Sequence, residues 1–72
     1  MDIQMQPIEG SSHIEAAGYD AGSQTLRVQF KGGKSYDYAG VPPEKVREFQ
    51  GSSSKGQFLR TFIKGIHAHA KV

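Results

Sequence analysis

The chain of 72 residues contains no cysteine and no tryptophan, and only 36% of its residues are hydrophobic. The absence of cysteine excludes disulfides and thiolate metal sites, and it fits a reducing compartment. No apolar run approaches the roughly 20 residues that cross a bilayer, and the first residues lack the basic start and apolar stretch of a signal peptide. We therefore expect a protein of the cytoplasm.

A chain of this length forms one domain with a small core. Folding removes only roughly 60% of the unfolded chain's surface from water, so nearly every large apolar side chain must be used. Catalysis needs a nucleophile, a base and an orienting group in one cleft, and a domain this small rarely encloses a pocket of about 300 Å³ or more. We therefore expect a binding module and not an enzyme, with no cofactor.

Three segments show the pattern of short strands. In the clearest one, Leu26, Val28 and Phe30 alternate with polar residues, which predicts one buried and one wet face. Gly32 and Gly33 follow, and a glycine pair suits a two-residue hairpin turn because both positions can adopt positive φ. The predicted strands are residues 13–19, 25–31 and 34–39.

Two helices are predicted after the strands. The first runs from about Pro43 to Gln50, because proline is preset for the first turn of a helix. The second begins after Ser54, which with Gln57 has the spacing of a capping box. Gly65 is the expected end of that helix. Its apolar stripe comprises Phe58, Leu59, Phe62 and Ile63.

The predicted fold is an α+β domain: a three-stranded antiparallel β-meander followed by two α-helices packed on one face. Residues 1–10 are expected to be a flexible N-terminal lead-in, 11–66 the single domain and 67–72 a loose C-terminal tail. The side chains expected to dominate the core are Phe30, Phe49, Phe58 and Phe62.

Positive charge is concentrated in the second half of the chain. Residues 39–72 carry six basic and two acidic side chains, whereas residues 1–38 carry three basic and five acidic ones. On an unbroken last helix, Arg60, Lys64, His67 and Lys71 would form one basic stripe, which Lys45 and Arg47 could extend. Such a stripe can track a phosphate backbone; the alternative is an ordinary solvated helical surface.

Tyr36 and Tyr38 lie on one face of the third predicted strand. Exposed rings there could stack on nucleic-acid bases. Alternatively the rings pack under the helices, which follows if they share a side of the sheet with Leu26 and Val28. We favour the core interpretation, because a small domain has few aromatic side chains to spare.

Ser54-Lys55-Gly56 opens the second helix. Free amide groups, the lysine charge and the small glycine could together hold one phosphate, but simple capping by Ser54 is the favoured interpretation. His67 and His69 have the spacing of a metal-binding pair, but two ligands make a poor site, so no metal is expected.

The chain resembles the KTSC domain over residues 11–66. The resemblance rests on three segments and their order: SSHIEAAGYD, TLRVQFKGGKSYDYAGVP and FQGSSSKGQFLRTFIKG. The Y-x-Y motif of that family corresponds to Tyr36-Asp37-Tyr38, and its S-x-G element corresponds to Ser54-Lys55-Gly56. An asparagine that family members often carry after that glycine is missing here.

The KTSC family is named for a module at the C-terminus of some lysyl-tRNA synthetases and also occurs as a free-standing protein in bacteria and phages. The resemblance implies a fold and a candidate RNA partner, and it carries over no catalytic residues.

Two functions are compatible with these patterns. The first is a module that binds RNA or single-stranded nucleic acid through a basic C-terminal helix. Its phosphate contacts would come from Lys55, Arg60 and Lys64, supported by Arg47 and Lys45, with Tyr36 or Tyr38 stacking on bases. The second is a protein–protein interaction module of a bacterial or phage protein, which would use a sheet edge or the helical layer.

Overall fold

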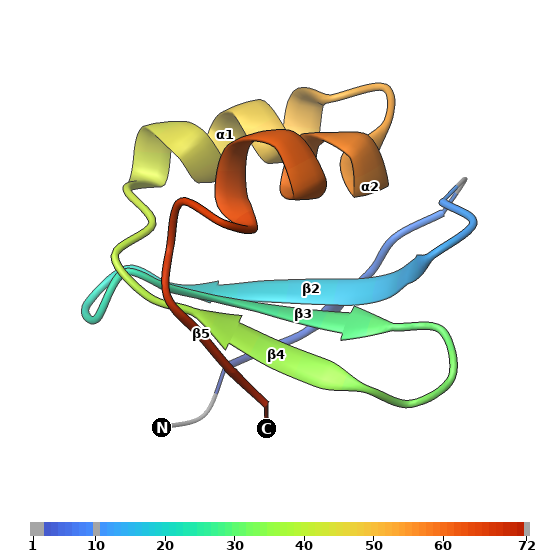
Figure 1. Cartoon of the computed structure of the whole chain (residues 1–72), viewed down its shortest axis with the longest axis horizontal. Helices are drawn as coiled ribbons and strands as arrows, with labels where there is room; N and C mark the ends of the chain where they lie inside the picture. Colours follow the sequence, from blue (N-terminus) through green and yellow to red (C-terminus); the bar gives the residue numbers. More distant parts are fainter. Residues whose placement is uncertain (1–2, 10, 72) are drawn as a thin grey trace.

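The computed structural model describes residues 3–9 and 11–71 and has two layers, a five-stranded sheet with helices on one face (Figure 1). All neighbouring strands are antiparallel, and the strands follow chain order across the sheet. The strands are β1 (Gln6–Pro7), β2 (Ile14–Asp20), β3 (Thr25–Phe30), β4 (Ser35–Tyr38) and β5 (His69–Lys71). The helices are α1 (Pro43–Gly51), α2 (Lys55–Phe58) and η1 (Leu59–Ile63).

The predicted α+β class, with two helical segments on one face of an antiparallel sheet, is confirmed. The hairpin lies where it was expected, and Gly32 and Gly33 both have positive φ, at 103° and 90°. Its turn is not the predicted two-residue one, because the Phe30 amide donates to the Lys34 carbonyl over 2.7 Å and closes a loop of residues 31–33. The predicted count of three strands is wrong. β1 pairs with β2 at Ala16 and Ala17, and β5 pairs with β4 along its edge. Both added strands are too short to show an alternating pattern in sequence.

The N-terminal segment packs against the sheet as well as pairing with it. Gly18 points to the face opposite the helices, since its neighbours Ala17 and Tyr19 pack against the core. A side chain at Gly18 would collide with residues 3–5, and Ile3 there is only 9% exposed. The lead-in therefore contributes to the packed structure, although Met1, Asp2 and Gly10 lie outside the described residues.

The second predicted helix is split into two kinds of turn. α2 is followed directly by η1, a π-helical turn in which the Lys64 amide donates to the Leu59 carbonyl over 2.6 Å. The chain then leaves the helix, and Gly65 has a φ of 90°. The segment 67–72, predicted to be a loose tail, contains a strand, because His69–Lys71 form β5. Val72 lies outside the described residues.

The predicted capping box at the start of α2 is wrong. The Ser54 side chain makes no capping hydrogen bond. The Ser54 backbone is held instead by Ser52, whose hydroxyl accepts from the Ser54 amide over 3.2 Å and donates to the Ser54 carbonyl over 3.0 Å. A local serine turn thus takes the place of a cap.

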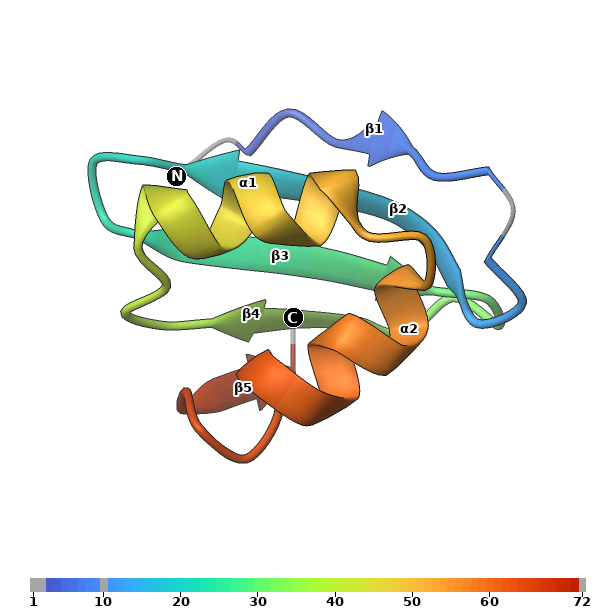
Figure 2. The same cartoon turned by 90° about the horizontal axis from the view of Figure 1, so that it is seen from above.

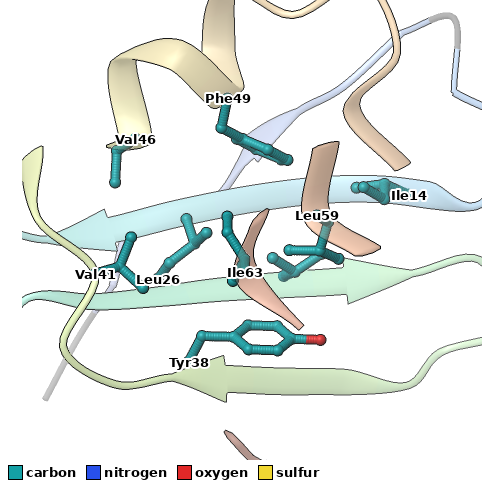
Figure 3. Close-up of a cluster of buried hydrophobic side chains, with 9 residues drawn as sticks. Ile14, Leu26, Tyr38, Val41, Val46, Phe49, Leu59 and Ile63 are labelled. Carbon is teal, nitrogen blue, oxygen red and sulfur yellow. The ribbon is translucent and has the colours of Figure 1, made fainter. Parts of the chain in front are cut away.

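The core lies between the sheet and the helices (Figure 3). Its largest fully buried side chains are Tyr38, Phe49, Ile14, Leu26, Ile63, Val28 and Val41. Of the four phenylalanines expected to dominate it, only Phe49 is buried, and Phe62 is 49% exposed. A short helix can bury only one stripe, and Leu59 with Ile63, four residues apart, occupies it.

Within the described residues, the protein has no helix of the length and apolar character that crossing a membrane requires.

The burial difference between two phenylalanines predicts unequal effects on stability. Phe49→Ala should lower the free energy of unfolding by about 3–5 kcal/mol, because a 1%-exposed ring leaves a cavity. Phe62→Ala should lower it by less than about 1 kcal/mol, because half of that ring already faces solvent. Urea denaturation followed by circular dichroism measures both; equal losses would contradict this description of the core.

Gly18→Ala tests the packing of the N-terminal segment. The new Cβ would lie 2.6 Å from the Ile3 Cγ2 and closer still to the Gln4 carbonyl oxygen, so residues 3–5 must move. We expect a loss of about 1–3 kcal/mol in the free energy of unfolding. Gly51→Ala is the control, because nothing lies within 4 Å of its added Cβ. A Gly18→Ala protein as stable as the control would show that the segment is not packed there.

Candidate functional site

A hollow of about 520 Å³ opens between the start of β2, the end of β3 and the α2–η1 segment, and we call it the cationic hollow. The hollow is open to solvent on one side, so it is a surface depression and not a pocket that the domain encloses. Figure 2 shows the α2–η1 segment lying across the sheet, and the hollow is lined by this segment together with residues from the start of β2 and the end of β3. Its lining is Ser11, Ser12, His13, Phe30, Ser53, Ser54, Lys55, Gly56, Gln57, Leu59, Arg60 and Lys64.

The charge of this hollow is of one sign. Lys55, Arg60 and Lys64 contribute their cationic side chains from the helical wall, and the lining formed by described residues contains no carboxylate. The serines add hydroxyl groups, which can donate to an anion. Arg60 and Lys64 are exposed, so their charges are free to meet a ligand at the rim. The arrangement suits a phosphate or another anion of several oxygens.

The two walls of the cationic hollow come close at Gly56. A Cβ added there would lie 3.8 Å from the His13 Cδ2 and 4.0 Å from the Ser11 Oγ. Ser11 is itself fixed, because its hydroxyl oxygen accepts from the Ile14 amide over 3.0 Å and from the His13 amide over 3.3 Å. The start of β2 is thus held in place opposite the predicted phosphate-binding segment Ser54-Lys55-Gly56.

Of the three cations that line the hollow, Lys55 is the most buried. It is partly buried, and its Nζ donates to the Ser52 carbonyl over 3.3 Å. An ammonium group has three donors, so two remain for a ligand. The carbonyl contact orients the side chain without neutralising its charge.

Two other cations predicted for the nucleic-acid surface lie elsewhere. Lys45 and Arg47 are on α1 and do not line the cationic hollow. The Lys45 Nζ donates to the Phe62 carbonyl over 3.1 Å and contacts the His67 Nε2 at 3.0 Å. His67 Nδ1 lies 3.1 Å from the Ala39 carbonyl, which can only accept, so Nδ1 carries the proton and Nε2 accepts from Lys45.

The predicted basic stripe is therefore wrong as a single surface. The helix ends before Gly65, so His67 turns toward Lys45 and Lys71 lies on β5. Only Arg60 and Lys64 of that stripe remain together on the helical wall.

The core interpretation of the tyrosines is confirmed for Tyr38, which is 2% exposed and lies opposite Leu26 on β3. Tyr36 is partly buried, and its ring lies 5.8 Å from that of Phe30. A ring as buried as Tyr38 cannot stack on a base. The aromatic side chain that does line the cationic hollow is Phe30, which the alternation in β3 had assigned to the core.

Sequence reasoning missed Ser11, Ser12 and His13 as lining residues. They are about 40 positions away from Lys55 in the chain, so no local pattern links them. The hydrogen bonds of the described residues include none between the His13 imidazole and a serine hydroxyl. The histidines do not gather elsewhere either: within residues 3–9 and 11–71, no group of three or more His, Cys, Asp or Glu is placed to hold a metal.

Two tyrosines have altered acidity. Burial raises the pKa of Tyr38, and the neighbouring Tyr36 raises it further. Burial also raises the pKa of Tyr19, with added contributions from Glu44 and Asp20. The Tyr19 hydroxyl donates to the Val41 carbonyl over 2.5 Å, which ties β2 to the loop before α1.

Together, the five-stranded antiparallel sheet and the helices on one of its faces define a small α+β domain. The family model of the KTSC domain matches residues 10–67. This chain belongs to the KTSC domain family, as the resemblance of its motifs implied.

Similar proteins share the whole domain. The crystal structure of a KTSC domain protein from Yersinia pestis superimposes with a TM-score of 0.90 at 38% identity, covering 99% of both chains. A protein of Tsukamurella paurometabola is 47% identical over 60 residues, which are 83% of this chain and 88% of that protein. A lysine–tRNA ligase of Nostoc punctiforme is 40% identical over 57 residues, 79% of this chain but only 10% of the ligase.

The tyrosine pKa values predict how stability changes in alkaline solution. A raised pKa means that the folded state holds the Tyr38 proton more tightly than the unfolded state does. The protonated hydroxyl therefore contributes fully to the free energy of unfolding below about pH 10, and this contribution is lost as the pH rises through the pKa of the folded state. Tyr38→Phe should therefore lose less stability than the unsubstituted protein between about pH 9 and about pH 11. Urea denaturation across that range measures the difference; parallel curves would contradict it.

Proposed function

We propose that this domain is a binding module for RNA or another single-stranded nucleic acid, and that the cationic hollow receives its phosphates. The observation that carries the proposal is the convergence of Lys55, Arg60 and Lys64 on one hollow whose described lining contains no carboxylate. Phosphate oxygens are the partners that such a group of donors suits best. The hollow is too small for a duplex but has the volume of a ligand pocket of the usual range, roughly 300–1,000 Å³.

The family relationship is compatible with an RNA partner. The lysine–tRNA ligase of Nostoc punctiforme matches this chain over 57 residues, which are 10% of the ligase. The match covers only 10% of the ligase, so an RNA partner for this chain is a proposal. We also propose that this protein acts in the cytoplasm, as expected from its sequence.

The proposal is for binding without catalysis. A general base must reach the group from which it takes a proton, and no hydrogen bond joins the His13 imidazole to a serine hydroxyl within the described residues. The cations have no acidic partner in the lining. Such a site can hold an anion by charge and hydrogen bonds, which is what a binding module requires.

The apolar surface around Phe62 supports a second candidate, a protein–protein interaction module. Phe62 is 49% and Ile66 61% exposed, and the Phe62 ring packs at 4.9 Å on that of Phe58. Exposed apolar groups of this size can mark protein contacts. A partner that stays bound at high salt would favour this function, since phosphate binding weakens as salt rises.

Charge reversal at the hollow provides the main test. Arg60→Glu with Lys64→Glu should weaken binding to a short fluorescent single-stranded RNA by about tenfold or more at low salt, because two of three phosphate donors become repulsive. For the unsubstituted protein, three phosphate contacts predict a slope of log K against log salt of roughly −2. Fluorescence anisotropy measures both quantities.

The matched control is Arg47→Glu with Lys71→Glu, which changes the net charge equally at two exposed cations outside the hollow. We expect this control to keep most of the affinity, and circular dichroism should show both variants folded. Equal losses in the two variants would mean that only net charge matters, and the proposed site would be wrong.

A further inference from the structure

A second hollow, of about 560 Å³, lies beside the first and has different chemistry. It opens between β1, β2 and α1; Figure 2 shows β1 at the edge of the sheet, while α1 lies over β2 and β3. Its floor includes the core residues Leu26 and Phe49 and the half-buried Ile8 and Tyr19. These four side chains belong to the apolar part of a lining that is about half polar.

The rim of this hollow carries amides instead of charges. Gln4 and Gln6 stand on the β1 side and Gln50 on the α1 side, and all three are exposed. We call this space the amide hollow. Each glutamine offers two donors and an acceptor. Among the described residues of its lining, Lys55 is the only charged one.

Lys55 lines both hollows, so the cationic hollow and the amide hollow meet at this side chain. A nucleotide has the same two parts side by side, an anionic phosphate and a neutral, flat base. The base presents apolar faces and an edge of mixed donors and acceptors, which glutamine amides can match. A peptide would have no comparable need for a cation at the junction.

We propose that the amide hollow is a nucleobase subsite, which takes an unstacked base while its phosphate is held in the cationic hollow. This inference rests on the proposed function. Gln6 and Gln50 read the edge of the base from opposite walls, and the half-buried Tyr19 and Ile8 contact its face. Lys55 holds the phosphate that connects the two subsites.

The experiment compares two strands of equal length and charge. One is a short oligoadenylate, chosen because a glutamine amide pairs well with the edge of adenine; the other is the same sugar–phosphate chain without bases. Fluorescence anisotropy at low salt should show the oligoadenylate bound roughly five- to tenfold more tightly. The salt slopes of the two strands should be the same, because they carry the same phosphates.

Gln6→Ala with Gln50→Ala should remove most of this advantage and leave the affinity for the base-free strand unchanged. Gln29→Ala is the control, because this β3 glutamine lines neither hollow. Circular dichroism checks that the variants remain folded.

The outcomes separate the inference from the function beneath it. Equal, salt-dependent binding of both strands would overturn the base subsite and leave phosphate binding in place. A base preference that survives in Gln6→Ala with Gln50→Ala would also overturn it, because the base would then lie elsewhere. No binding of either strand at low salt would contradict the proposed function itself.

Discussion

The apolar contact between one face of the sheet and two short helical segments holds this molecule together. Tyr38 and Leu26, paired across β3 and β4, form the floor, and Phe49, Leu59 and Ile63 close it from above (Figure 3). Helical segments of nine, four and five residues are too short to be stable alone in water. Their position, and that of every cation they carry, therefore depends on this packing.

The candidate site is a consequence of how that packing is arranged. Leu59 and Ile63 face the core, so Arg60 and Lys64, each one position further along, turn outward beside the end of the sheet. The start of β2 comes to the same place because the sheet brings Ile14 opposite Phe30. Charges from the end of the chain and serines from its beginning thus share one hollow, and the core sets the spacing between them.

The face of the sheet away from the helices has its own constraints. Arg27 and Asp37 face each other across β3 and β4 and form a two-pronged ion pair, with Nε–Oδ1 at 2.7 Å and Nη2–Oδ2 at 3.0 Å. A pair of this geometry favours one register over its neighbours. Gly18 lets residues 3–5 approach β2 closely on this face, which places β1 where it forms one wall of the amide hollow.

Local patterns predicted a good part of this structure. The alternation around Val28, the glycine pair at Gly32 and the proline start at Pro43 each act within a few residues, and all three features are present. The capping box at Ser54 failed because a nearby serine offered the backbone a competing hydrogen bond. The short strand β5 had no pattern to read, since three residues are too few to show alternation.

The sequence by itself determined the class of the fold, its family and the excess of positive charge near the C-terminus, because composition and short-range periodicity act locally. Only the tertiary structure decided which residues share a site. It separated Lys45 and Arg47 from Lys55, buried Tyr38 and left Phe62 exposed. These outcomes depend on contacts between segments that lie far apart in the sequence. Those contacts form only when all the segments pack around one small core.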